Sequence, residues 1–402
     1  MVNHELSEFC NKARKELFGN IIPFWLKHSR DQENGGFYGR ITNDLRIEKK
    51  APKGLVQTSR ILWTFSALYQ LSAKDEYLEM AHWAYQFLID KYFDDQFGGV
   101  FWLLDYKGNV VEDKKKIYGQ AFTIFALAEY NKVSQNDEAL ARAFKLFHVI
   151  EENNYDDENK GYYETSNRDW SISEDMRLSE IDMNEKKSMN THLHLMEAYT
   201  TLYQVCPHQI LEFKLRELID DFTKFILDPD TKHLILFFDE FWRKKSENIS
   251  FGHDIEGSWL LCEAAKVLGD KDLIENIDRI ALDMVNVTIQ EGFSDKFSIY
   301  VEKCGDGSLD RSVHWWQQAE AVVGLVNAFQ ISEGKQYLEW ALKCWQFIED
   351  FIIDRSHGEW FYEIKQNCHP DHKRHKVSEW KGPYHNARAC MEIVKRLESG
   401  LV

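Results

Sequence analysis

The 402-residue chain lacks the features that would place it in a membrane. No run approaches the roughly 18 consecutive apolar residues that a membrane-spanning helix requires. The N-terminal segment MVNHELSEFCNKARKELFGNIIPFW has charges scattered through it and contains no apolar core, which predicts that no signal peptide is present. We therefore expect a cytoplasmic protein.

Cysteine, proline and excess positive charge are also scarce. The seven cysteines are widely spaced, odd in number and include no CxxC pair, which favours reduced thiols over a disulfide framework or a zinc site. The formal net charge is −17 and no basic cluster opposes it, so nucleic acid and membranes are not expected partners. The chain has only six prolines, which is typical of a mostly helical protein.

Cofactor-binding motifs are missing as well. The chain contains no Walker loop, no GxGxxG after a predicted strand and no GxSxG nucleophile elbow. We therefore expect no cofactor and no metal, and any catalysis has to come from acid/base side chains.

A glycine- or turn-centred aromatic stretch recurs along the chain. Its copies are GGFYG at Gly35, GGVFWLLD at Gly98, KGYYET at Gly161, TKHLILFFDEFW at Thr231, EGFSDKFSIYVE at Gly292 and HGEWFYEI at Gly358. The spacing between copies is nearly even, so six similar units fill the chain. Such self-similarity indicates a repeat architecture.

Each unit has the pattern of two helices around its aromatic stretch. The helix before it is amphipathic, as in Glu76 to Tyr92, and the helix after it is more apolar. The second helices are predicted to begin near Ser59, Tyr118, Met189, Asp254, Trp315 and Tyr384. We predict an all-α fold, a closed ring of six helical hairpins that forms one domain over residues 1–402, with short β excursions at its mouth. An open solenoid is the alternative, although it usually needs polar capping repeats.

Polar residues are concentrated in the first turns of the predicted inner helices. They are Arg60, Tyr118, Gln120, Asn190, His194, His253, Glu256, Trp259, Trp316, Glu320, His385 and Asn386. Burying such groups without partners costs several kcal/mol each, so we expect them to face one another across a wet pocket.

The stretch FGHDIEGSW is the most informative of these segments. His253, Glu256 and Trp259 fall three residues apart and share one helix face. The alternative is structural: Asp254 would cap the helix, and His253 would be a boundary residue. Zinc binding through His253 and Glu256 is disfavoured because no further ligand motif accompanies them.

Three other segments allow a similar choice between function and structure. Trp316 and Glu320 lie four residues apart on one helix face, where they form either a binding wall or a core tryptophan beside a buried acid. His385 follows Pro383 at a helix start and is either a catalytic base or a polar cap. Arg60 either faces the pocket or forms a structural ion pair.

Two reactions fit a pocket with these groups and with tryptophan faces on which a sugar can stack. The first is proton abstraction next to a carbonyl by a histidine, with a glutamate hydrogen-bonded to each histidine to set its tautomer and Arg60 stabilising the oxyanion. The second is glycoside hydrolysis by Glu256 and Glu320. A sugar-binding barrel without catalytic activity remains a third possibility.

Several of these segments together resemble a known family. ENGGFYG, SRILW, YGQAF, FGHDIE, WWQQAE and PYHN occur in the order typical of the N-acylglucosamine 2-epimerase superfamily, and are most similar to its cellobiose 2-epimerase branch. The resemblance implies an (α/α)6 barrel. It also implies cofactor-independent epimerisation at C2 of the reducing-end glucose of β-1,4-linked disaccharides such as cellobiose and lactose.

The resemblance also implies residue roles. The catalytic residues would be His253, His385, Arg60, Glu256 and Glu320, and the substrate-binding residues Tyr118, Asn190, His194, Trp259, Trp316 and Trp380. The implied reaction is ring opening, deprotonation at C2 to a cis-enediol, bond rotation and reprotonation. A 2-epimerase for mannose or N-acetylmannosamine, or an aldose–ketose isomerase, remains the alternative. The expected partner is a small disaccharide, and the expected state is a monomer or a weak homo-oligomer.

Overall fold

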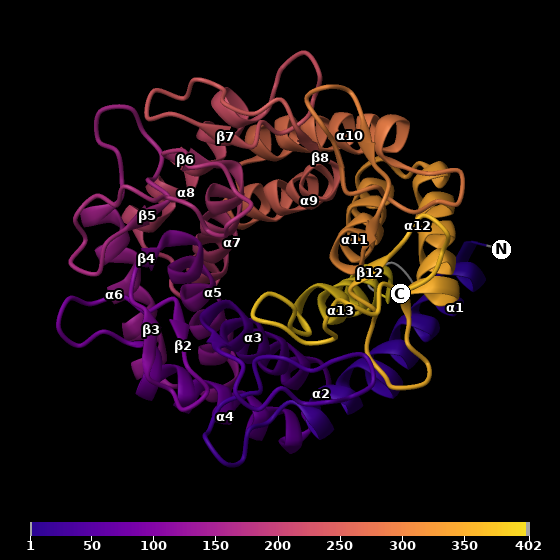
Figure 1. Ribbon diagram of the computed structural model, residues 1–402. Coiled ribbons are helices and arrows are strands. Elements are labelled where there is room, and N and C mark those ends of the chain that lie inside the picture. The colour runs from indigo at the N-terminus through magenta and orange to yellow at the C-terminus, as the bar shows by residue number, and fades with distance from the viewer. Residues whose placement is uncertain (1, 399–402) are drawn as a thin grey trace.

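Six inner helices form a closed ring in the computed structural model, which describes residues 2–398 (Figure 1). They are α3 (Leu55–Ser72), α5 (Ile117–Ser134), α7 (Met189–Val205), α9 (Phe251–Leu268), α11 (Trp315–Ser332) and α13 (Tyr384–Glu398). Each packs against the next, and α13 packs against both α11 and α3, which closes the ring. The predicted barrel is therefore confirmed, and the open solenoid was the wrong alternative.

An outer layer of helices surrounds this ring. It consists of α1 (Val2–Glu16), η1 (Leu17–Ile21), α2 (Ile22–His28), α4 (Asp75–Tyr92), α6 (Asp137–Asn153), α8 (Gln209–Asp221), η2 (Phe222–Ile226), α10 (Lys271–Gly292), α12 (Lys335–Phe347) and η3 (Ile348–Ile352). The three η segments are π-helical turns. The inner helices are buried on both sides, which explains why they are apolar nearly all round. No described helix is long and apolar enough to cross a bilayer.

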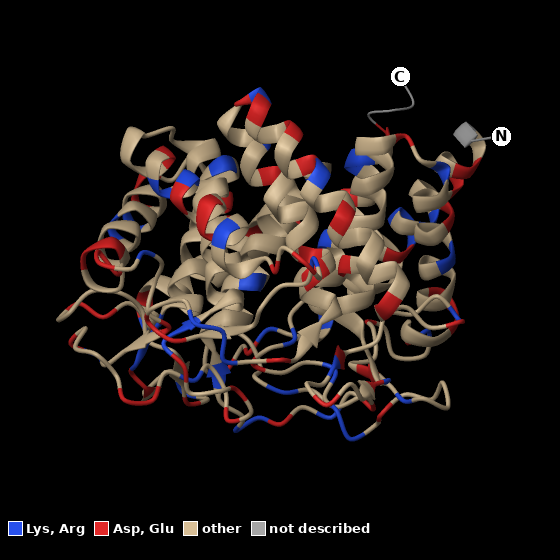
Figure 2. Cartoon of the chain, turned by 90° about the horizontal axis from the view of Figure 1, so that it is seen from above, with Lys and Arg blue, Asp and Glu red and all other residues tan. Residues whose placement is uncertain are grey.

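The two ends of the ring are built differently. At one end, which we call the rear, connections between inner and outer helices are short, such as residues 73–74 between α3 and α4. Left-handed residues end four of these inner helices there: Ala73, Gln135, Gly269 and Glu333. At the other end, the mouth, long segments lead into the inner helices; they gather at the lower edge in Figure 2. The first inner helix was predicted to begin near Ser59, but α3 begins earlier in the sequence, at Leu55.

The aromatic stretches form the predicted short excursions at the mouth. Each is a turn closed by one antiparallel bridge: Arg30 to Phe37, Phe93 to Val100, Tyr155 to Tyr162, Leu227 to Leu234, Phe293 to Ile299 and Ile353 to Trp360. Gly36 has a φ of +64°, and a β-carbon there would lie 2.6 Å from the ring of Phe87, so both backbone and space require glycine.

Very short antiparallel strands join neighbouring excursions. They are β1 (Lys53–Gly54), β2 (Leu103–Leu104), β3 (Val110–Glu112), β4 (Lys115–Lys116), β5 (Thr165–Ser166), β6 (Lys187–Ser188), β7 (Phe237–Phe238), β8 (Ile249–Ser250), β9 (Glu302–Lys303), β10 (Leu309–Asp310), β11 (Val313–His314) and β12 (Glu363–Ile364). Pairs such as β1–β2, β4–β5 and β6–β7 link the segment before one inner helix to the excursion of the next unit. Strand pairing thus joins the segments at the mouth into a continuous rim.

The fourth residue of an inner helix commonly anchors the neighbouring excursion. The Gln120 side chain bonds both the backbone N–H and the C=O of Val100, at 2.9 and 2.8 Å. Asp254 accepts from the backbone N–H of Leu234 at 2.8 Å. Gln120 therefore does not face the pocket as expected, and Asp254 holds a turn of the preceding segment rather than capping its own helix.

Four buried lysine–aspartate pairs reinforce the same rim. They are Lys53–Asp31 at 2.8 Å, Lys115–Asp94 at 2.9 Å, Lys187–Asp156 at 2.9 Å and Lys376–Asp354 at 2.6 Å, with every side chain at most 4% exposed. The aspartate also accepts backbone N–H groups of its turn, as Asp31 does from Glu33 and Asn34. Each pair fixes an aromatic turn to the segment that leads into an inner helix.

Removing one partner of such a pair is expected to destabilise the barrel strongly. Lys53→Met leaves the Asp31 carboxylate buried without its cation, which should lower the free energy of unfolding by about 3 kcal/mol. Urea unfolding followed by circular dichroism measures this. The matched control is Lys224→Met. Lys224 and its partner Asp220 are each more than half exposed, so loss of this ion pair should lower the free energy of unfolding by about 1 kcal/mol or less. Equal losses in the two variants would contradict this role.

Candidate active site

The helical register places one set of residues around the axis of the ring, near the mouth. The sixth residues of five inner helices are Arg60, Phe122, His194, Glu256 and Glu320, and the second residues of four are Tyr118, Asn190, Trp316 and His385. Positions four apart share a helix face, so the two levels face the axis of the ring together. The polar groups predicted from the sequence thus come together largely because their positions in the repeats are equivalent.

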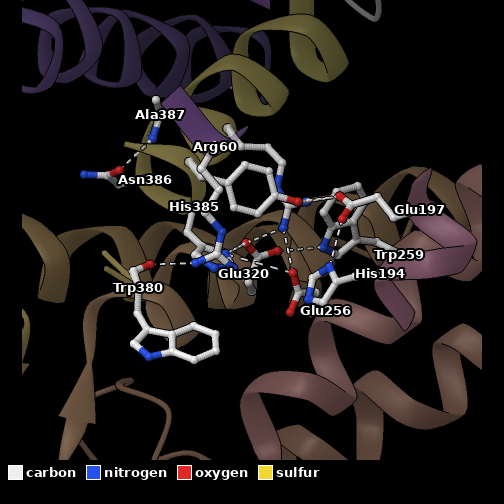
Figure 3. Close-up of polar contacts among 12 residues, drawn as sticks. Arg60, His194, Glu197, Glu256, Trp259, Glu320, Trp380, His385, Asn386 and Ala387 are labelled. Atoms are coloured by element: carbon white, nitrogen blue, oxygen red, sulfur yellow. Dashed lines mark hydrogen bonds and ion pairs between the residues drawn. The ribbon is translucent and has the colours of Figure 1, made fainter. Parts of the chain in front are cut away.

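His385 is held by a carboxylate. Its Nδ1 lies 2.7 Å from Oε1 of Glu320, whose Oε2 accepts from Nε1 of Trp259 at 3.1 Å (Figure 3). Because a carboxylate only accepts, Nδ1 carries a proton, and in the neutral ring Nε2 is then a base. Burial, followed by the positive charges of Arg60 and Arg388, lowers the pKa of His385, so the ring is neutral near pH 7.

A buried arginine joins the carboxylates of the pocket. Nη2 of Arg388 lies 2.7 Å from Oε1 of Glu256 and 2.7 Å from Oε1 of Glu320. Its Nη1 donates to Glu197 and contacts the hydroxyl of Tyr384. One guanidinium thus fixes three carboxylates from three different inner helices.

The pKa of Glu256 is strongly shifted by its surroundings. Burial, and then the negative charge of Glu320, raises the pKa of Glu256 well above its usual range. Ligand atoms of Glu256, Glu320 and His385 lie within 4.8 Å of one another, a spacing that a metal ion could use. The guanidinium of Arg388 already supplies the cation to both carboxylates, so the geometry favours a proton-transfer centre over a metal site.

His253 has a different partner from the one expected. Its Nδ1 is hydrogen-bonded to the hydroxyl of Ser250 at 2.7 Å, so the prediction that a glutamate holds each histidine is right for His385 and wrong for His253. Desolvation lowers the pKa of His253 to about 3, which keeps this ring neutral as well.

Trp316 brings the two histidines to one place. Its ring centroid lies 4.8 Å from that of His253 and 5.6 Å from that of His385. Two neutral imidazoles, from helices far apart in sequence, therefore contact one indole ring.

Arg60 forms no ion pair with any described residue. Its Nη2 donates to the hydroxyl of Tyr118 at 2.9 Å. Its Nη1 donates to the backbone carbonyl of Trp380 at 2.7 Å (Figure 3). Its Nε is buried without a partner among the described residues. The structural ion pair considered for Arg60 was therefore wrong, and its charge is available to a ligand.

The remaining predicted residues occupy different positions. His194 is hydrogen-bonded to Glu197 at 2.9 Å, and its ring lies edge-on to that of Tyr118 at 5.0 Å. Asn190 has a buried Oδ1 without a partner in the described chain. Asn386 donates to Glu359 at 2.7 Å, beside the last aromatic turn, so it does not face the pocket as expected.

Four residues of the site were missed from the sequence: Glu197, Ser250, Tyr384 and Arg388. Glu197 lies three residues after His194, and Arg388 three residues after His385, so helix spacing alone places each pair on one face. That spacing could have found them. Ser250 lies just before α9, and no pattern indicates its contact.

A cavity of about 540 Å³ lies next to this cluster, on the mouth side. Trp380, Trp102 and Lys116 border it, and the ring centroids of the two tryptophans are 5.5 Å apart. An ion pair of Arg40 and Glu379, 2.9 Å long, borders it as well. Aromatic faces beside hydrogen-bonding groups make this a suitable place for a second ring of a ligand.

Comparison with known proteins identifies the relatives of this chain. The chain is 45% identical over 383 residues to a cellobiose 2-epimerase of Bacteroides fragilis, covering 95% of this chain and 98% of that protein. The structure of cellobiose 2-epimerase from Bacillus thermoamylovorans superposes with a TM-score of 0.92 at 39% identity, over 97% of this chain and 100% of that chain. A GH76 α-mannanase of Bacteroides thetaiotaomicron, with a TM-score of 0.63 and 10% identity, shares the fold alone.

The family model described as N-acylglucosamine 2-epimerase matches residues 36–389, a span that contains every residue of the predicted site. The chain belongs to the N-acylglucosamine 2-epimerase family.

Proposed function

We propose that this protein is a cofactor-independent 2-epimerase that converts the reducing-end glucose of β-1,4-linked disaccharides, such as cellobiose and lactose, to mannose. The observation that carries this proposal is the contact of both His253 and His385 with the ring of Trp316. The similarity to cellobiose 2-epimerases over nearly the whole chain supports it.

The proposed reaction uses the two histidines in turn. His385, with Nδ1 held by Glu320, moves the proton that opens the sugar ring. His253 then removes the proton from C2, and Arg60 stabilises the oxyanion of the cis-enediol. Rotation about the C2–C3 bond presents the opposite face, and the proton returns to C2 with inverted configuration.

The site supports epimerisation over glycoside hydrolysis. Oε1 of Glu256 and Oε1 of Glu320 both lie 2.7 Å from the same nitrogen of Arg388, and Trp259 occupies the second oxygen of Glu320. Both carboxyl groups are thus engaged by protein groups, which leaves neither free to act on a glycosidic bond. A hydrolytic role would also leave the two histidines without a function.

The mouth cavity supports a disaccharide over a monosaccharide as substrate. The reducing-end sugar would lie beside Trp316 and the two histidines, and the second ring would lie against Trp380 and Trp102, which line the mouth cavity. We further propose one catalytic domain over residues 1–402. A cytoplasmic location is consistent with seven unpaired cysteines.

The reaction is tested by incubating cellobiose, lactose, mannose and N-acetylmannosamine separately with the enzyme in D2O. Proton NMR should show deuterium entering C2 of the reducing end of cellobiose and lactose, with mannose-type anomeric signals appearing. A fructose-ended product would assign the enzyme to the aldose–ketose isomerases. Free glucose from cellobiose without an epimer would assign it to the hydrolases.

The two histidine roles are separable by experiment. His253→Ala should lose C2 exchange by about 10²–10⁴-fold while still accelerating mutarotation, because the ring-opening group is intact. His385→Ala should lose the acceleration of mutarotation. Both are measured by NMR on cellobiose in D2O. C2 exchange at the normal rate in His253→Ala would refute the assignment.

Glu320→Gln keeps the shape of the side chain but removes the charge that orients His385. We expect kcat to fall by about 10²-fold or more, with a small change in KM, since the loss concerns proton transfer rather than binding. Steady-state kinetics on cellobiose measures this. The matched control is Glu16→Gln, another buried acid that accepts from a tryptophan, Nε1 of Trp360 at 2.9 Å, and it should keep full activity.

A further inference from the structure

A second cavity, of about 310 Å³, lies at the rear of the ring. It is lined by the C-terminal halves of α3, α5, α7 and α9 and by α13. A layer of ninth residues separates it from the catalytic pocket: Trp63, Phe125, Glu197 and Trp259. Arg388 completes this layer, so the cavity shares walls with the catalytic cluster and opens away from it.

We propose that this rear cavity is a binding site for a neutral, hydroxyl-rich small molecule of monosaccharide size. Its volume is at the lower end of the roughly 300–1,000 Å³ of small-molecule sites, which favours a single sugar-like ring. The site is additional to the proposed epimerase site, whose histidines do not line it.

Three aromatic side chains contribute to the inner wall of the rear cavity. The rings of Trp63 and Phe125 stack on each other, with centroids 5.1 Å apart and planes 12° apart. Trp259 lies on the same level of the neighbouring wall. These rings give the wall an apolar surface against which the C–H groups of a sugar can pack.

Two buried donors in this wall have no acceptor. Nε1 of Trp63 and Nε of Arg388 are buried without a hydrogen-bond partner among the described residues. The side chains themselves are buried too: Trp63 is 9% exposed and Arg388 is 2% exposed. Both residues line the rear cavity, so its wall holds hydrogen-bond donors that no described protein group uses.

Neutral polar groups complete the lining. Thr200, Thr201, Gln70 and Gln204 border the cavity, and hydroxyl and amide groups both donate and accept, as a polyol requires.

The charged side chains of the rear cavity largely neutralise one another. Lys132 lies 2.8 Å from Glu129 and donates to Gln204 at 3.0 Å, which joins α5 to α7 at the rim. Glu263 is paired with Arg396 at 2.9 Å. Because these charges are already paired, a neutral ligand fits the lining better than an anion or a cation.

The site is tested by isothermal titration calorimetry with three probes: myo-inositol, D-glucose and D-mannose. myo-Inositol has no anomeric carbon and cannot be a substrate, so its binding is independent of the proposed reaction. We expect myo-inositol or a hexose to bind saturably, with one molecule of ligand per protein chain bound in the rear cavity. Ala67→Trp, which fills the cavity from α3, should abolish this binding.

The matched control is Ser72→Trp, on the same helix but outside the cavity, which should keep the binding. Thr201→Val, which removes one lining hydroxyl at nearly constant shape, should weaken binding at least five-fold and provides a milder test if the tryptophan variant misfolds. The proposal is overturned if none of the three probes binds in a manner sensitive to Ala67→Trp or Thr201→Val. It is also overturned if cellobiose displaces myo-inositol competitively.

Discussion

The buried guanidinium of Arg388 is the interaction on which the organisation of the site depends. Burying an arginine and three carboxylates is unfavourable unless each charge finds a partner at short range. Here α13 supplies the cation, and α7, α9 and α11 supply Glu197, Glu256 and Glu320. The same contacts also bear on protonation, because burial and the neighbouring acids raise the pKa of Glu256, while Glu320 holds Nδ1 of His385. Structure and proposed chemistry therefore depend on one ion cluster.

The repeat explains how these groups reach one axis. Each inner helix begins at a rim that is fixed by an aromatic turn, in four units by a buried lysine–aspartate pair, and by side chains such as Gln120 and Asp254. Because the helix starts are fixed, the sixth residue of each helix arrives at the same height. Substituting that residue changes the chemistry of the pocket without changing the ring.

Much of this could be predicted from the sequence because the periodicity is strong. The repeated aromatic turns gave the number of units, and the apolar inner helices indicated a closed ring, which α13 completes by packing against α3. The polar first turns gave most of the site. Residues on inner helices are buried on every face, however, so periodicity cannot tell which polar group turns to the axis and which to the neighbouring turn. For this reason Gln120 and Asn386 were placed wrongly, whereas Arg388 and Glu197 could have been found from their spacing to His385 and His194.

The order of the helices along the chain has a consequence for synthesis. The last described helix, α13, carries both His385 and Arg388, and it closes the ring against α1, α3 and α11. While the polypeptide emerges from the ribosome, Glu197, Glu256 and Glu320 are made before the cation that neutralises them. Closure of the ring and completion of the cluster thus depend on the same helix, because without α13 the ring is open between α11 and α3 and the three acids lack the guanidinium that joins them.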